Sequence, residues 1–314
     1  MKRLWSSALL FVAIGVALYA GLYYASERLV YRTGKSNPFF KIATAEHLAY
    51  DWVVLGASHA MPLDFADFNA FMQRETNLRI INLASPGTGP LYNRFVLESF
   101  LSKRRAGAVL YVVDSFAFYS RTWNEDRFAD VKLIRRTPFD RAIATRLWRY
   151  CIDEGVDPRT LLDYVIGFSK VNNRERFEPD IWEGEKQFDR VYRTSATAIR
   201  SRIDYLYPEP PAPAAFARYL QDFDKLVAMA QRHGIKVAAV KMPVPAQFRS
   251  RIPNEAAFDQ AFVRIATSRK IPFYDFSRAL YEPRFYFDTD HLNRAGLTEF
   301  FNLRLRSIFV GTIQ

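Results

Sequence analysis

The sequence has 314 residues, of which 49% are apolar and 25% are charged, a composition typical of a globular protein. Its formal net charge of +11 indicates anionic surroundings, but the basic residues are scattered and no zinc-finger, basic-zipper or RNA-recognition motif is present, so nucleic acid is not expected as a partner. The sequence also lacks a phosphate-binding loop, a dinucleotide fingerprint and an H-E-x-x-H motif, and it has a single cysteine, so we expect neither a cofactor nor a metal.

An uncharged apolar segment, Leu4 to Ala25, follows the basic pair Lys2 and Arg3. A helix needs about 20 apolar residues to cross the hydrocarbon core of a bilayer. The segment therefore predicts an N-terminal transmembrane anchor over residues 1–25, and a cleavable signal peptide is the alternative. The preceding basic pair favours a cytoplasmic N-terminus. We expect a single-pass protein of the bacterial cytoplasmic (inner) membrane, with the rest of the chain on the periplasmic side beyond a polar connector at 26–46.

Short apolar runs alternate with helical patterns over residues 47–314. The runs are 51–57, 78–83, 108–114, 235–241 and 271–276. Near-continuous apolar runs are typical of parallel strands that are covered on both faces. Helical periodicity is clear at 90–105 and 214–234. This alternation predicts a doubly wound α/β fold.

One interval breaks the alternation, because the chain between 114 and 235 is far longer than a crossover connection needs. Several of its segments have helical patterns, and the proline-rich stretch 207–216 is expected to be a stiff return. We interpret residues of about 120–210 as a helical insertion that forms a cap or a partner-binding surface.

The first predicted strand leads into Gly56-Ala57-Ser58-His59. In doubly wound sheets the functional residues lie at the carboxyl ends of the strands, so Ser58 is a candidate nucleophile. A loop serine is the alternative, because Ala60 breaks the G-x-S-x-G pattern of α/β-hydrolases.

The small-residue segment "INLASPG" stands at a second predicted strand end. The backbone amide of Gly87 in it is a candidate oxyanion donor, and the alternative is that the segment only forms a turn. Near the C-terminus, Asp288 and His291 stand three residues apart before a predicted helix. This spacing lets a carboxylate orient an imidazole that accepts a proton from a serine. Helix capping by His291, and orientation by Asp290 instead of Asp288, are the alternatives.

Taken together, these three segments resemble the conserved blocks of the SGNH (GDSL-like) hydrolase superfamily. The resemblance implies a flavodoxin-like, three-layer α/β/α fold with a five-stranded parallel sheet. It also implies catalysis by Ser58, His291 and Asp288, with the amides of Ser58 and Gly87 holding the oxyanion. The block III asparagine of that family is missing. The chain offers Asp114, Ser115 and Phe116 at that position, and Asp114 and Ser115 are candidate substrate-binding residues. His59 is a third candidate, with a packed or solvent-facing side chain as the alternative.

The anchor and the altered block III make the chain similar to envelope SGNH proteins, such as D-alanyl-transfer proteins and polysaccharide O-acetyltransferases. This resemblance implies an extracytoplasmic serine esterase or O-acyltransferase that acts on acyl esters of a cell-envelope polysaccharide or other glycopolymer, in some cases beside a membrane-bound O-acyltransferase. The alternative is a catalytically weak SGNH-fold scaffold that binds a membrane acyl-transfer protein through the insertion.

Overall fold

The computed structural model describes residues 1–193, 195–208 and 212–313. The chain divides into two compact units. Unit 1 contains Met1–Ala43 and Phe128–Asp180, and unit 2 contains Thr44–Arg127 and Ile181–Gln314. The helical insertion expected at about 120–210 is thus divided between them. Residues 209–211 of the proline-rich stretch lie outside the described residues.

A five-stranded sheet forms the centre of unit 2, with the strand order β2-β1-β3-β4-β5. All neighbouring strands are parallel. The strands are β1 (Ala49–Leu55), β2 (Ile80–Asn82), β3 (Arg105–Val112), β4 (Lys236–Lys241) and β5 (Phe273–Asp275). This is the flavodoxin-like order, and it confirms the predicted parallel α/β sheet.

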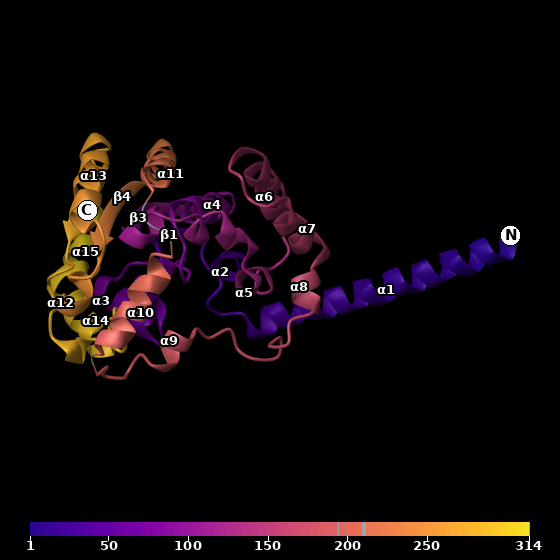
Figure 1. Ribbon diagram of the computed structural model, residues 1–314, viewed down its shortest axis with the longest axis horizontal. Helices are drawn as coiled ribbons and strands as arrows, with labels where there is room; N and C mark the ends of the chain where they lie inside the picture. The colour runs from indigo at the N-terminus through magenta and orange to yellow at the C-terminus, as the bar shows by residue number, and fades with distance from the viewer. Residues whose placement is uncertain (194, 209–211, 314) are drawn as a thin grey trace. The chain divides into compact units, whose positions relative to one another are not determined.

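Helices cover both faces of the sheet (Figure 1). Those of one face are α4 (Pro90–Leu101), α11 (Pro213–Arg232) and α13 (Glu255–Ser268). Those of the other face are α3 (Phe68–Thr76), α14 (Arg294–Phe300) and α15 (Arg306–Ile313), the last two joined by the π-helical turn η6 (Phe301–Leu305).

Alternate strand residues face the two helical layers. Val54, Leu110 and Val240 belong to the apolar cluster that packs under α3, α14 and α15. On the opposite face, the ring of Tyr111 lies 4.8 Å from that of Phe223 in α11. Burial on both faces explains why each strand appears in the sequence as a continuous apolar run.

Short elements complete unit 2 around the carboxyl ends of the strands. They are η1 (Met61–Asp64), η2 (Ser115–Phe118), η3 (Arg121–Trp123), η4 (Asp126–Ala129), α9 (Glu183–Lys186), α10 (Ala196–Leu206), α12 (Ala246–Arg249) and η5 (Pro283–Phe285). The last two residues of η4 fall in unit 1.

Unit 1 is helical, with α1 (Lys2–Thr33), α2 (Pro38–Thr44), α5 (Val131–Ile134), α6 (Arg141–Asp153), α7 (Pro158–Ile166) and α8 (Phe168–Val171). Among the described residues, one helix, α1, is long and apolar enough to cross a membrane. It continues beyond Ala25 to Thr33, and the chain between Ala25 and Gly34 contains no glycine or proline. Much of the segment 26–46, expected as a connector, is therefore helical.

Candidate active site

The loop after β1 is held in a defined conformation at Gly56. This residue has φ +142°, and a Cβ atom there would lie 2.8 Å from the carbonyl oxygen of Val112. The Gly56 N–H donates to Asn93 Oδ1 at 3.0 Å, and Thr88 Oγ1 donates to the Gly56 carbonyl at 2.9 Å. These contacts place Ser58 at the carboxyl edge of the sheet, beside the loop that follows β2.

Ser58 is buried, and its carbonyl accepts a hydrogen bond from the Met61 N–H. Within the described residues, neither its hydroxyl nor its own N–H makes a hydrogen bond. Both groups are therefore available to a bound molecule.

The structure brings Asp288 and His291 together as their spacing predicts. His291 Nδ1 lies 2.8 and 3.0 Å from the two carboxylate oxygens of Asp288. That carboxylate also accepts hydrogen bonds from the backbone N–H groups of Asp290 and His291. The ring orientation is therefore fixed, with the proton on Nδ1. His291 Nε2 is buried and makes no hydrogen bond in the described part of the chain, including none with Ser58.

Gly87 lies in the loop after β2 with φ +60°, a conformation that favours glycine. A Cβ atom there would lie 2.6 Å from the Trp123 ring. Its N–H makes no hydrogen bond to any described residue. The Thr88 and Ser85 contacts to the Gly56 carbonyl link this loop to that of Ser58.

His59, which follows Ser58, links the two halves of the site. Its ring lies 4.8 Å from that of His291, centroid to centroid. His59 Nδ1 lies 2.5 Å from Asp114 Oδ1, and its Nε2 lies 3.4 Å from Asp290 Oδ2. Burial acts to lower the pKa of His59, but Asp114 and then Asp290 act in the opposite direction and raise it to about 10. His59 is therefore an imidazolium at neutral pH.

Asp290 is fully buried, yet it is ionised. Burial acts to raise its pKa, but Arg202 and the neighbouring imidazoles hold that pKa well below its usual range. Arg202 Nε donates to both carboxylate oxygens at 3.0 and 3.1 Å. Asp290 thus pairs with Arg202 and His59. The carboxylate that orients the His291 ring is that of Asp288.

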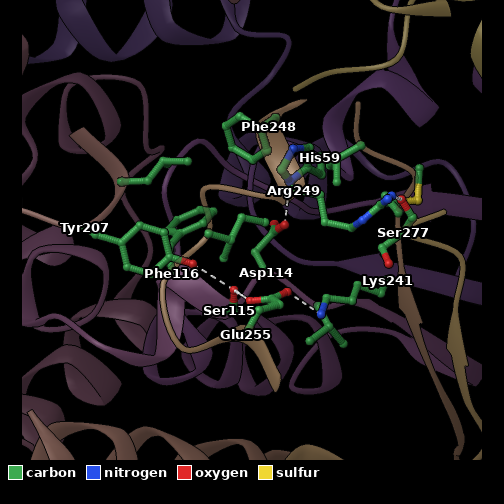
Figure 2. Close-up of a pocket in the computed structure, with 15 residues that line it drawn as sticks. His59, Asp114, Ser115, Phe116, Tyr207, Lys241, Phe248, Arg249, Glu255 and Ser277 are labelled. Atoms are coloured by element: carbon green, nitrogen blue, oxygen red, sulfur yellow. Dashed lines mark hydrogen bonds and ion pairs between the residues drawn. The ribbon is translucent and has the colours of Figure 1, made fainter. Parts of the chain in front are cut away.

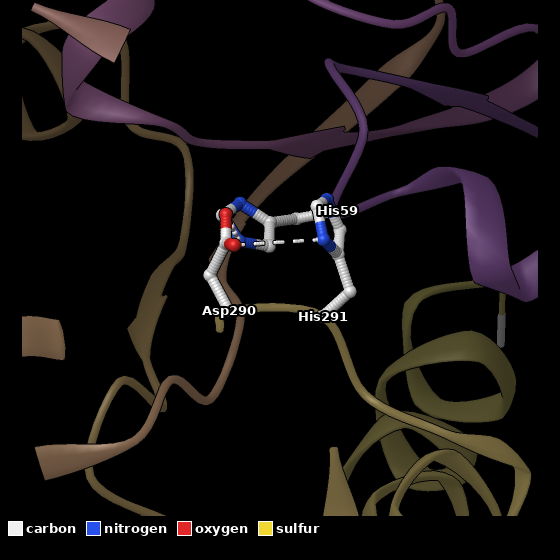
Figure 3. A group of neighbouring side chains, drawn as sticks. All are labelled: His59, Asp290 and His291. Atoms are coloured by element: carbon white, nitrogen blue, oxygen red, sulfur yellow. Dashed lines mark ion pairs between the residues drawn. The ribbon is translucent and has the colours of Figure 1, made fainter. Parts of the chain in front are cut away.

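The side-chain atoms here that could bind a metal already have other partners. His59, Asp290 and His291 converge from two segments and offer ligand atoms within 4.8 Å of one another (Figure 3). However, His291 faces Asp290 with Nδ1, at 3.7 Å, and Asp288 already holds that atom. A cation would also meet the Arg202 guanidinium and displace a proton from His59. The cluster is therefore a balanced ion network and a poor fit to a metal.

A pocket adjoins this network (Figure 2). Its lining comes from the carboxyl end of β4, from the segments that follow β1, β3 and β5, and from α10, α12 and α13. His59 and Asp114 are among the residues that line it. The Ser115 hydroxyl lies 2.5 Å from Glu255 Oε2 and 2.8 Å from the Tyr207 hydroxyl. The segment after β3 therefore supplies a carboxylate that pairs with His59 and a hydroxyl that hydrogen-bonds in the pocket wall.

Two further cations line the pocket. Lys241 pairs with Glu255 and lies 2.5 Å from Asp259. Arg249 donates to the Ser277 carbonyl at 2.9 Å and forms no ion pair among the described residues. The sequence alone does not point to Arg202, Lys241, Arg249 or Glu255, because none of them belongs to a recognisable motif.

No family model and no curated protein matches the chain. A crystal structure of a Bacteroides fragilis protein described as an acylhydrolase is similar at 11% identity and a TM-score of 0.41, covering 87% of this chain and 94% of that one. A GDSL-like lipase of Bacteroides thetaiotaomicron is similar at 10% identity and a TM-score of 0.38, covering 83% and 87%. The fold assignment rests on the strand order of the sheet itself.

Proposed function

We propose that the chain is a membrane-anchored serine esterase or O-acyltransferase of the SGNH type that acts on acyl esters outside the cytoplasm. The observation that carries this proposal is the state of His291. Its Nδ1 is held by Asp288, while its buried Nε2 makes no hydrogen bond in the described chain. The His291 ring lies 4.8 Å from the ring of His59, the residue that follows Ser58. A buried nitrogen without a hydrogen-bond partner costs folding free energy, so its presence calls for an explanation. A catalytic role provides one.

In the proposed reaction, Ser58 Oγ attacks the ester carbonyl carbon as His291 Nε2 takes the hydroxyl proton. The amides of Ser58 and Gly87 donate hydrogen bonds to the oxyanion of the tetrahedral intermediate. The intermediate collapses to an acyl-enzyme, and the leaving alcohol receives the proton from His291. Water or a sugar hydroxyl then attacks the acyl-enzyme, with His291 again taking and returning a proton.

His59 supplies a fixed positive charge next to the nucleophile in this proposal. Its imidazolium pairs with Asp114 and faces Asp290. A cation held near the reacting carbonyl stabilises negative charge that develops there. We propose that this charge compensates for the missing block III asparagine.

For the substrate we propose an anionic glycopolymer of the cell envelope. Arg249 supports this choice, because it presents a guanidinium without a carboxylate partner to the pocket beside His59. Arginine recognises carboxylate and phosphate groups through paired hydrogen bonds. Arg249→Ala should therefore raise KM at least about 10-fold for an acidic acylated oligosaccharide and leave KM for a neutral one unchanged.

The test of catalysis uses the full-length chain in detergent. Wild-type protein should react with a fluorophosphonate probe and hydrolyse p-nitrophenyl acetate. Ser58→Ala should lose the label and at least about 100-fold in kcat. The matched control is Ser85→Ala, because Ser85 is also a buried serine at this edge of the sheet and its hydroxyl makes no hydrogen bond to a described residue. Equal labelling of wild type and Ser58→Ala would refute the proposal.

A second candidate is a catalytically weak scaffold that binds a membrane-bound O-acyltransferase. The observation in its favour is that the Ser58 hydroxyl makes no hydrogen bond with His291 in the described chain. A folded wild-type protein that neither labels nor hydrolyses esters, and that co-purifies with such an acyltransferase, would support the scaffold.

A further inference from the structure

Unit 1 exposes an apolar surface that its own fold leaves uncovered. We call it the α6–α8 apolar surface. Its side chains, each between 41% and 64% exposed, are Trp148, Ile152, Leu162, Val165, Ile166 and Phe168. On α7 the spacing of Leu162, Val165 and Ile166 places them on one face, while Thr160 and Tyr164 are buried on the other. Helix α7 is therefore amphipathic with its apolar face outward.

The corner between α7 and α8 packs directly against α1 (Figure 1). The Tyr19 hydroxyl donates to the Ile166 carbonyl at 3.0 Å. The Tyr23 ring packs so closely on Gly167 that a Cβ atom there would overlap it. Lys170 pairs with Glu27 at 2.5 Å and is almost fully buried. These contacts fix which part of α1 lies beside the surface.

That part of α1 is the outer end of its apolar stretch, Leu4–Ala25. At a rise of about 1.5 Å per residue, Tyr19 lies about 9 Å and Tyr23 about 3 Å inside this end. When the stretch crosses the bilayer, Ile166 and Gly167, which contact these two tyrosines, consequently lie about 3–9 Å inside the hydrocarbon boundary, among the outer acyl carbons. Interfacial helices bury their apolar faces about 5–10 Å into this layer.

We propose that the α6–α8 apolar surface inserts into the outer interface of the membrane that α1 spans, so that its occupant is lipid. Unit 1 is then fixed to the bilayer by two elements, a spanning helix and a helical corner lying in the interface. The inference requires the retained anchor of the proposed function, but it is independent of the catalytic residues.

The experiment measures the depth of single labels in the full-length chain, reconstituted in vesicles of phosphatidylethanolamine and phosphatidylglycerol. Cys151 is the only cysteine, so Cys151→Ala gives a background for Leu162→Cys and Phe168→Cys, each labelled with an environment-sensitive fluorophore. Phe177→Cys is the matched control. Phe177 is exposed in the same unit, and its neighbour Arg176 contacts Thr33, which lies beyond the apolar stretch.

Nitroxide-bearing lipids should quench the labels at 162 and 168 at least twice as strongly as the label at 177. Equal quenching at 168 and 177 would overturn the inference. Labels at 162 and 168 that are shielded from aqueous iodide but not quenched by lipid nitroxide would also overturn it, in favour of a protein partner. A purified chain whose mass shows that α1 has been cleaved off would also overturn the inference, because α1 would then not hold the surface at the membrane. Hydrolysis of p-nitrophenyl acetate is measured on the same samples. It tests the catalytic proposal separately, so a failure of the membrane-insertion inference can be told apart from a failure of the proposed catalysis.

Discussion

The charge of His59 can be tested through the stability of the fold. In the folded chain the pKa of His59 is about 10, compared with an ordinary value of 6.5. Because the folded-state pKa is raised, protonation stabilises the fold fully below pH 6.5, and this stabilisation is lost as the pH rises towards 10. At about 1.4 kcal/mol for each pKa unit, the contribution at pH 7 is about 4 kcal/mol.

His59→Gln removes the titrating group and keeps a polar side chain of similar length. The free energy of unfolding should fall between pH 7 and pH 10 by about 3 kcal/mol more for wild type than for His59→Gln, because the variant has no proton to lose there. Guanidinium titrations in detergent, followed by circular dichroism at both pH values, measure this difference. Comparing the two proteins cancels the other groups that titrate in the same range.

A direct check is available by NMR, because the chain has only 4 histidines. The imidazole Cε1–H signal that disappears in His59→Gln should remain at the imidazolium position up to about pH 8.5, given the raised pKa of His59. If that signal titrates near pH 6.5, and the two proteins lose stability in parallel, His59 is not the cation that we describe.

Four further outcomes are expected. Asp288→Asn should lower kcat for p-nitrophenyl acetate at least about 100-fold without changing the unfolding temperature, since it disturbs the proton on His291 Nδ1. Gly87→Ala should cost at least about 1 kcal/mol in the free energy of unfolding, because its φ is positive and Trp123 fills the space. Arg202→Met should cost about 3–5 kcal/mol, because it leaves the buried Asp290 without its main partner. Dialysis against EDTA should leave hydrolysis unchanged.

Each of these outcomes has a clear contrary result. Undiminished kcat in Asp288→Asn would assign the orientation of His291 to another group. A Gly87→Ala protein as stable as wild type would contradict the close packing on Trp123. An Arg202→Met protein of unchanged stability would show that Asp290 is not ionised. Activity that is lost with EDTA and restored by zinc would overturn the description of the cluster as a balanced ion network.

Much of the fold was predictable because it depends on local pattern. Strands that are buried on both faces must be apolar along their whole length, so the runs that became β1 and β3 could be recognised directly. The Asp288–His291 pair was predictable for a similar reason, since three residues of chain bring the two groups together. The prediction of a connector after Ala25 was wrong for the end of α1. The residues there are polar, but they tolerate a helix, and the helix continues to Thr33.

The sequence by itself determined the parallel sheet, the apolar N-terminal helix and the residues offered at the strand ends. Only the tertiary structure decided the charge of His59 and the partner of Asp290. These depend on pairs such as His59–Asp114 and Arg202–Asp290, which are 55 and 88 residues apart in the chain. The strength of an ion pair depends on separation and burial in space, and both are set only when the loops close over the sheet.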